Sequence, residues 1–371
     1  MKLRRKDFFK GVALGTISLP FLLRSVLSET SAQGKTTSLS GEVYNWKMVT
    51  TWPPNFPVLG EACNVFVDLV KKMSGGRMNI HVYGGGELVP PLECFDTVRT
   101  GGAEIGSGAA YYWAGKAPAA QFFASVPFGM NAQQLNAWIY SGGGLALWEQ
   151  LYQDFNLIPM AAGNTGVQMG GWFNREINTL ADFKGLKMRI PGLGGKVLEK
   201  AGGAPVLLAG GEIYTGLERG IIDATEWLGP YHDTKMGFND IAKYYYSPGW
   251  HEPGTALEYI FNKEKFEALP EDLQGILRAA TSYINTWVLS EMEARNSAAL
   301  AELQAKGVEI RTFSPEILQQ LRQFTEEVIA EITDQDAFAK RVYDSYNDFR
   351  EKAADYANIT ERLFYESIQP S

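Results

Sequence analysis

The chain has 371 residues, 45% of them hydrophobic and 20% charged, so it is long enough for two globular domains with sizeable cores. Its formal net charge is −8 at pH 7, and an acidic chain without a basic stripe argues against a nucleic-acid partner. The nine tryptophans and seventeen tyrosines suit a cleft for a small polar ligand, although most of them must lie in the core.

The first forty residues are predicted to lie outside the fold. A basic segment containing Arg4 and Arg5 precedes an apolar run over residues 11–23, which is too short to span a membrane. Small residues follow, and we expect cleavage after Ala32. Residues 1–32 resemble a twin-arginine export signal, and a short membrane anchor is the alternative. We therefore expect a periplasmic protein.

A strand is expected within residues 44–54, and a helix followed by a strand within 56–86. Cys63 and Cys94 both fall in helix-like stretches. In an oxidising compartment they could form a disulfide, but nothing in the sequence brings them within bonding distance. Two free, buried thiols are the favoured interpretation.

One pattern occurs twice in the chain. Residues 82–113 and 202–227 each contain a glycine-rich turn, a short amphipathic helix that ends at glycine, and a strand that ends in aromatic residues. Two related α/β units predict two similar lobes that face each other. The alternative is a coincidence between two common helix–glycine–strand turns.

Two polar residues stand out in the middle of the chain. Gln168 is predicted to lie in mid-strand within the glycine-rich stretch 164–173, where a ligand or another backbone can approach closely. A short strand pattern that begins at Leu186 ends in Arg189, and Pro191 and Gly192 stop it. Arg189 is either an ordinary surface residue at a strand exit or a clamp for a carboxylate, because a buried arginine needs an anion. That anion is either a resident Asp or Glu or a ligand.

Two carboxylates follow downstream. Glu226 and Trp227 end the strand of the second repeat, and Glu252 lies in the turn-rich stretch 247–255, which we interpret as part of a hinge. Two carboxylates beside a carboxylate ligand would repel it unless a hard cation such as Na⁺, Ca²⁺ or Mg²⁺ lies between them. For each residue the alternative is a polar group paired locally. Oxygen ligands without cysteine or histidine suit such a cation. The three histidines, His81, His232 and His251, are scattered along the sequence, which argues against a zinc site or a Ser-His-Asp triad.

The C-terminal third is predicted to be helical, over residues 263–305 and again over 315–365 with a break near 334–336. Long closing helices of this kind can brace two lobes or dock against another subunit.

Four stretches, residues 108–123, 180–192, 217–233 and 248–274, resemble the extracytoplasmic solute receptors of TRAP transporters, the DctP-type family. The resemblance covers roughly residues 41–350. It implies an α/β, two-lobed periplasmic binding protein fold with a hinge and long C-terminal helices. The implied boundaries are 41–166 plus 255–294 for lobe I, 167–254 plus 295–350 for lobe II, and a C-terminal helix or tail at 351–371.

The resemblance also implies residue roles. The arginine that pairs with the substrate carboxylate corresponds to Arg189. The stretches 224–233 and 249–255 are most similar to the subgroup that binds 2-oxo acids or lactate with a metal ion. The ligand and a Na⁺ or Ca²⁺ ion are then held by Gln168, Glu226, Trp227 through its backbone carbonyl, and Glu252. Tyr111 and Tyr112, with Trp113, resemble an aromatic loop over the pocket.

The function expected is thus a periplasmic solute-binding protein that delivers a monocarboxylate such as pyruvate, 2-oxobutyrate or lactate to a TRAP membrane permease. A homodimer through the C-terminal helix is possible in this family. The alternatives are a C4-dicarboxylate or sugar-acid receptor of the same family, and an exported enzyme that uses Glu226 or Glu252 as a base. We expect no catalytic residues, because the sequence supplies no nucleophile–base pair and no cofactor motif.

Overall fold

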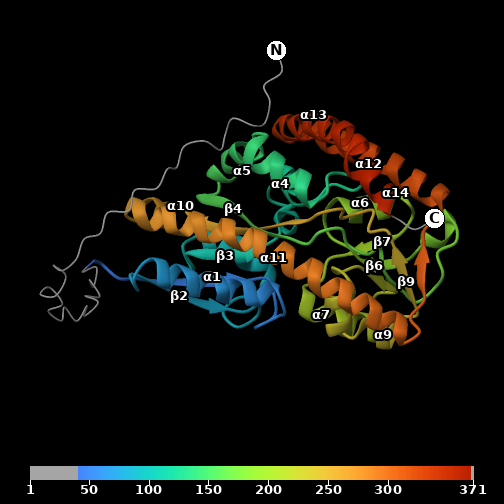
Figure 1. Ribbon diagram of the computed structural model, residues 1–371, viewed down its shortest axis with the longest axis horizontal. Coiled ribbons are helices and arrows are strands. Elements are labelled where there is room, and N and C mark those ends of the chain that lie inside the picture. Colours follow the sequence, from blue (N-terminus) through green and yellow to red (C-terminus); the bar gives the residue numbers. More distant parts are fainter. Residues whose placement is uncertain (1–40, 369–371) are drawn as a thin grey trace, which may run out of the picture. The chain divides into compact units, whose positions relative to one another are not determined.

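Two β-sheets organise the chain in the computed structural model, which describes residues 41–368, so the expected export signal lies outside the described residues (Figure 1). The first sheet has the order β2-β1-β3-β10-β4 and the second has the order β11-β9-β5-β8-β6-β7. The strands of the first sheet are β1 (Tyr44–Thr50), β2 (Met78–Tyr83), β3 (Ile105–Gly108), β4 (Leu157–Asn164) and β10 (Ala256–Asn262). Those of the second are β5 (Gly171–Phe173), β6 (Lys187–Arg189), β7 (Ala204–Val206), β8 (Ala224–Thr225), β9 (Tyr244–Ser247) and β11 (Ile310–Thr312). We call the first sheet with its helices lobe I and the second lobe II.

The predicted repeat is confirmed in the topology. In lobe I, β1 lies between β2 and β3 and is parallel to both; in lobe II, β6 lies between β7 and β8 and is parallel to both. An antiparallel strand then extends each sheet, β10 beside β3 and β5 beside β8. The two lobes are therefore variations of one α/β arrangement, and not merely similar in sequence.

Helices connect and cover these strands. The first half of the chain contributes α1 (Leu59–Met73), η1 (Pro91–Glu93), α2 (Cys94–Arg99), η2 (Ala110–Trp113), η3 (Pro118–Ala120), α3 (Gln121–Ala124), α4 (Ala132–Ser141) and α5 (Gly144–Gln153). Lobe II contains η4 (Leu180–Phe183), α6 (Gly192–Lys200), α7 (Gly210–Glu218), α8 (Pro230–Lys235) and α9 (Phe238–Ile241). The remaining helices are α10 (Lys263–Glu267), α11 (Glu271–Ala305), α12 (Pro315–Gln335), α13 (Ala337–Ile359) and α14 (Glu361–Ile368).

The long helix α11 contacts both lobes, since it packs against α1 and β4 on one side and against α8 on the other (Figure 1). The predicted break in the last helical stretch is confirmed at Asp336, whose side chain accepts hydrogen bonds from the backbone N–H groups of Phe338 and Ala339 and so begins α13.

Cys63 and Cys94 are buried and unbonded, as the favoured interpretation predicted. Burial raises the pKa of the Cys63 thiol to about 11, so both sulfurs behave as small apolar groups in the core of lobe I. Within residues 41–368, no helix combines the length and the apolar character that a membrane crossing requires.

The prediction that Gln168 lies in mid-strand is wrong. Gln168 belongs to the irregular connection between β4 and β5, where the chain passes from lobe I to lobe II. Gly166 takes a positive φ of 68° two residues before it, which interrupts the strand, and β5 begins only at Gly171. The expected close approach is nevertheless present, because a Cβ on Gly249 would lie 2.2 Å from the carbonyl oxygen of Gln168.

Candidate functional site

Arg189 and Glu226 meet at the carboxyl ends of two neighbouring strands. Arg189 is the last residue of β6 and lies in register with Thr225 of the parallel strand β8, so Glu226 follows directly beside it. Parallel strands bring residues at their carboxyl ends to one edge of the sheet, where open α/β sheets bind ligands. Both side chains are only 1% exposed, and they form an ion pair. The sequence left open whether the anion beside Arg189 is a ligand or a carboxylate of the protein. In the structure it is the carboxylate of Glu226.

The guanidinium of Arg189 has further partners. Its Nε donates to the Leu208 carbonyl at 3.3 Å, and its Nη2 donates to the Tyr112 hydroxyl at 3.3 Å. Its central carbon lies 5.0 Å from the ring centroid of Trp227. Burial by itself would lower the pKa of Arg189, but the Glu226 carboxylate and the nearby Tyr112 outweigh it and raise the pKa. Arg189 is therefore a fixed cation.

Gln168 and Glu252 belong to two connections that run between the lobes. The backbone N–H of Gln168 donates to the carbonyl of Glu252 at 3.2 Å, and Gly249 donates back to the Gln168 carbonyl at 3.0 Å. The Gln168 side-chain nitrogen donates to Glu252 Oε2 at 2.7 Å, and the Thr255 hydroxyl donates to the same oxygen. Gln168 Oε1 is buried and has no hydrogen-bond partner.

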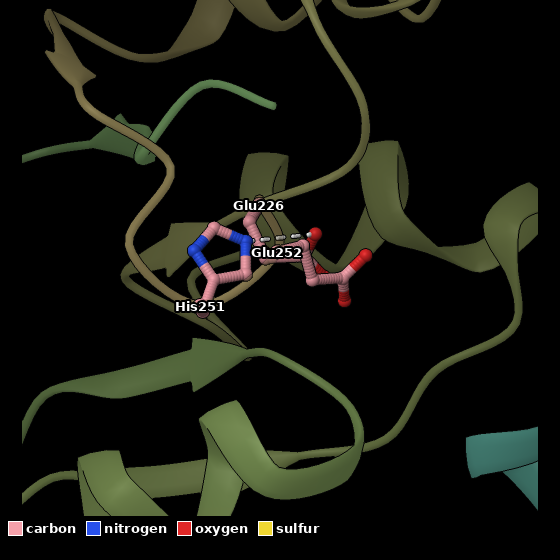
Figure 2. A group of neighbouring side chains, drawn as sticks. All are labelled: Glu226, His251 and Glu252. Atoms are coloured by element: carbon pink, nitrogen blue, oxygen red, sulfur yellow. Dashed lines mark ion pairs between the residues drawn. The ribbon is translucent and has the colours of Figure 1, made fainter. Parts of the chain in front are cut away.

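His251 joins the two halves of the site, and sequence reasoning missed it. Figure 2 shows its imidazole beside Glu226, with Nε2 3.4 Å from Glu226 Oε2. One ligand atom from each of Glu226, His251 and Glu252 lies within 4.8 Å of the others. His251 therefore lies directly beside the oxygen ligands predicted for the cation. The one hint in the sequence is that His251 directly precedes Glu252, but its place beside Glu226 depends on how the connection between β9 and β10 folds back.

Aromatic side chains cover the site from both lobes. Tyr111 and Tyr112 lie in η2 of lobe I, with their ring centroids 4.9 Å apart. Trp227 of lobe II lies with its ring centroid 6.4 Å from that of Trp52 in lobe I. All the residues predicted for the site, from Tyr111 to Glu252, are brought to one region between the lobes, and each of them except Tyr112 is buried.

The donor set fits a hard cation. Burial, together with the charge of Glu226, raises the pKa of Glu252 to about 7, so the free site resists holding both carboxylates ionised. The unpartnered Gln168 Oε1 adds a neutral oxygen beside them. Carboxylate and amide oxygens are the ligands that Ca²⁺ and related hard cations prefer. A cation at this point would neutralise the carboxylates and satisfy the amide oxygen together.

Two α/β lobes that enclose a buried set of charged and polar groups define a solute-binding protein of the periplasmic type. The chain belongs to the family of bacterial extracellular solute-binding proteins, family 7 (DctP), whose model matches residues 48–336.

Similar proteins are known in sequence and in structure. A monocarboxylate 2-oxoacid-binding periplasmic protein of Nostoc sp. is 40% identical over 371 residues, which is 100% of both chains. A TRAP periplasmic solute-binding protein from Colwellia psychrerythraea, with bound calcium and pyruvate, is 40% identical, with a TM-score of 0.86 over 88% of this chain and 100% of that one. One from Pseudoalteromonas atlantica T6c, with bound sodium and pyruvate, is 40% identical, with a TM-score of 0.87 over 88% and 100% of the two chains.

Proposed function

We propose that this protein binds a small 2-oxo or 2-hydroxy monocarboxylate of the pyruvate type together with Ca²⁺ or Na⁺, and delivers it to a TRAP membrane permease in the periplasm. The observation that carries the proposal is the convergence, at one buried point between the lobes, of a guanidinium with the oxygens of Gln168, Glu226 and Glu252. The Nostoc relative and the two pyruvate-bound structures support the choice of ligand.

The residue roles that we propose are as follows. Arg189 receives the ligand carboxylate on the side of its fork that faces Tyr112, where Nη2 has only the tyrosine hydroxyl as partner. Gln168 Oε1, the carboxylates of Glu226 and Glu252, and the backbone carbonyl of Trp227 hold the cation. Tyr111 and Tyr112 cover the ligand and exclude water. His251 lies close enough to Glu226 to orient that carboxylate.

Charge explains why the cation and the ligand should bind together. Arg189 against an ionised Glu226 and an ionised Glu252 leaves one net negative charge, and a bound carboxylate makes it two. A calcium ion cancels both charges, whereas a sodium ion cancels one. Uncompensated charges are costly in a buried site, so the ligand alone should bind weakly.

Titration calorimetry tests this function. We expect pyruvate, 2-oxobutyrate and lactate to bind in the presence of calcium or sodium, and a chelator with sodium-free buffer to remove the binding. Succinate that binds regardless of cation would contradict the proposal and favour the C4-dicarboxylate alternative. We also propose binding without turnover, so pyruvate recovered after long incubation should be unchanged by NMR; a new product would favour the enzyme alternative.

The proposal has three further parts. Residues 1–32 act as a twin-arginine export signal. The lobe boundaries are 41–166 plus 255–294 and 167–254 plus 295–350. The chain dimerises through its C-terminal helices, because large apolar residues of α13 and α14 are at least half exposed there: Tyr356, Ile359, Leu363, Phe364, Tyr365 and Ile368.

A further inference from the structure

A line of aromatic rings extends from the binding site along the contact between the lobes. The ring centroids of Tyr112 and Trp52 are 6.3 Å apart, and that of Phe56 lies 6.1 Å from that of Trp227. Trp52 and Phe56 belong to the loop of lobe I between β1 and α1, whereas Trp227 belongs to lobe II. The line ends at His232 of α8, whose ring centroid is 5.5 Å from that of Phe56.

His232 makes a hydrogen bond across this contact. Its Nε2 lies 2.9 Å from the carbonyl oxygen of Pro57, in the turn that leads into α1 of lobe I. A carbonyl oxygen can only accept, so Nε2 carries the hydrogen and donates. The side chain is fully buried. Burial lowers the pKa of His232 to about 4, so the imidazole remains neutral at ordinary pH.

A second contact, beside His232, joins α8 to α1 through Arg295 of the long helix α11. Arg295 of α11 donates from Nη1 to the Tyr231 hydroxyl of α8 at 3.1 Å, and its Nη2 lies 3.0 Å from Glu61 of α1. The arginine is partly exposed, so this ion pair is screened by solvent and contributes less than the buried hydrogen bond. Neither contact includes a residue to which we assign the ligand or the cation.

We propose that His232 is a closure residue, which holds lobe II against lobe I and thereby sets the affinity for the carboxylate without touching it. The inference rests on the proposed function. Opening the lobes would break the bond to Pro57, leave that carbonyl to water and separate Phe56 from Trp227. A group that contacts its partner only in the closed form raises the closed population, and the apparent affinity rises in proportion to that population.

The test compares His232→Ala with His232→Gln, in which the amide nitrogen of glutamine can take the place of Nε2 and donate to Pro57. Pyruvate binding with calcium is measured by calorimetry, dissociation by stopped flow, and the contraction on ligand binding by small-angle X-ray scattering. His81→Ala is the matched control, because His81 is exposed on β2.

For His232→Ala we expect the Kd for pyruvate to rise about tenfold, within the usual range of coupling between sites, chiefly through faster dissociation. The contraction at saturating ligand should be smaller than in the wild type. The ratio of the Kd values for pyruvate and 2-oxobutyrate should not change, because neither ligand reaches His232. His232→Gln should restore most of the affinity, and His81→Ala should match the wild type.

An unchanged Kd in His232→Ala would overturn the inference, as would a higher Kd with the full contraction, an altered ratio between the two acids, or a glutamine variant as weak as the alanine variant. If alanine prevents folding, the glutamine variant alone decides, since we expect it to fold and to bind within a few-fold of the wild type. Wild-type protein that fails to bind pyruvate with either cation would instead overturn the proposed function itself.

Discussion

At the scale of single residues, the central feature is a guanidinium that already has a resident partner. Arg189 and Glu226 are both buried, and removing one charge of a buried pair leaves the other uncompensated, at a cost of about 3–5 kcal/mol. Deleting Arg189 would therefore confuse a loss of binding with a loss of stability. A substitution that conserves the charge separates the two effects.

For Arg189→Lys we expect the pyruvate affinity to fall at least tenfold while the free energy of unfolding changes by less than about 2 kcal/mol. Lysine keeps the positive charge beside Glu226 but has no planar guanidinium, so it cannot bind Glu226 and Leu208 and still direct Nη2 to the ligand carboxylate. Calorimetry and urea unfolding measure the two quantities, and exposed Arg175→Lys is the control. A lysine variant that binds as tightly as the wild type would show that the fork does not hold the ligand.

For Glu226→Gln we expect weaker pyruvate binding that excess calcium partly restores. The glutamine keeps an oxygen near the cation but removes one negative charge, so the affinity for the cation falls. Because the ligand binds together with the cation, the affinity for pyruvate falls as a consequence. Calorimetry across a calcium series checks this. If the affinity for pyruvate and its calcium dependence both remain at the wild-type values, Glu226 has no place in the site.

At the scale of elements, strand β10 holds the aromatic turn η2 in place through a buried hydrogen bond. Glu258 of β10 is fully buried and accepts hydrogen bonds from the indole of Trp113 at 2.6 Å and from the Tyr152 hydroxyl at 3.1 Å. Trp113 follows Tyr111 and Tyr112 directly, so this carboxyl group positions the turn that covers the site. Burial raises the pKa of Glu258 to about 8, despite both hydrogen bonds.

The raised pKa of Glu258 predicts a pH dependence of stability. The folded protein holds this proton up to about pH 8, whereas the unfolded chain releases it near 4.5. The stabilisation is therefore complete below pH 4.5 and declines by about 1.4 kcal/mol per pH unit as the pH rises toward 8. Urea unfolding at pH 5.5 and 7.5 should show this decline in the wild type and a smaller one in Glu258→Gln. If the free energy of unfolding declines equally in both proteins, the group that titrates is not Glu258.

The exposed apolar face at the end of α13 and on α14 predicts an oligomer. Replacing Leu363 and Phe364 by aspartate should convert a dimer to a monomer, because each buried apolar side chain contributes on the order of 1.5–3 kcal/mol at such a contact. Multi-angle light scattering measures the mass. Ile221→Asp, at an exposed position of lobe II, should leave the mass unchanged. A wild-type protein that is monomeric at all concentrations would refute this prediction.

Features that depend on residues close together in the sequence were predicted correctly, whereas features that depend on distant segments were not. The repeat, the helix break at Asp336 and the strand that ends at Arg189 follow from local pattern and were confirmed. The strand around Gln168 was not, because the chain crosses between the lobes there and Gly166 at positive φ overrides the β pattern. His251 was missed because its place beside Glu226 depends on how the second crossing connection folds back, which no local pattern encodes.

At the scale of the whole molecule, the site exists only because two lobes meet. Lobe I supplies Tyr111 and Tyr112, lobe II supplies Arg189 and Glu226, and the crossing connections supply Gln168 and Glu252. None of these groups binds a small acid well in open water, where an exposed ion pair contributes about 1 kcal/mol or less. Closure of the two lobes removes that water, so the affinity for the ligand depends on how the lobes are positioned.

The most direct test is a crystal structure of the protein with calcium and pyruvate. We predict that the pyruvate carboxylate lies within hydrogen-bonding distance of the Arg189 guanidinium, with the cation held between pyruvate and the oxygens of Gln168, Glu226 and Glu252. Pyruvate bound elsewhere, with Arg189 engaged by Glu226 alone, would contradict the account.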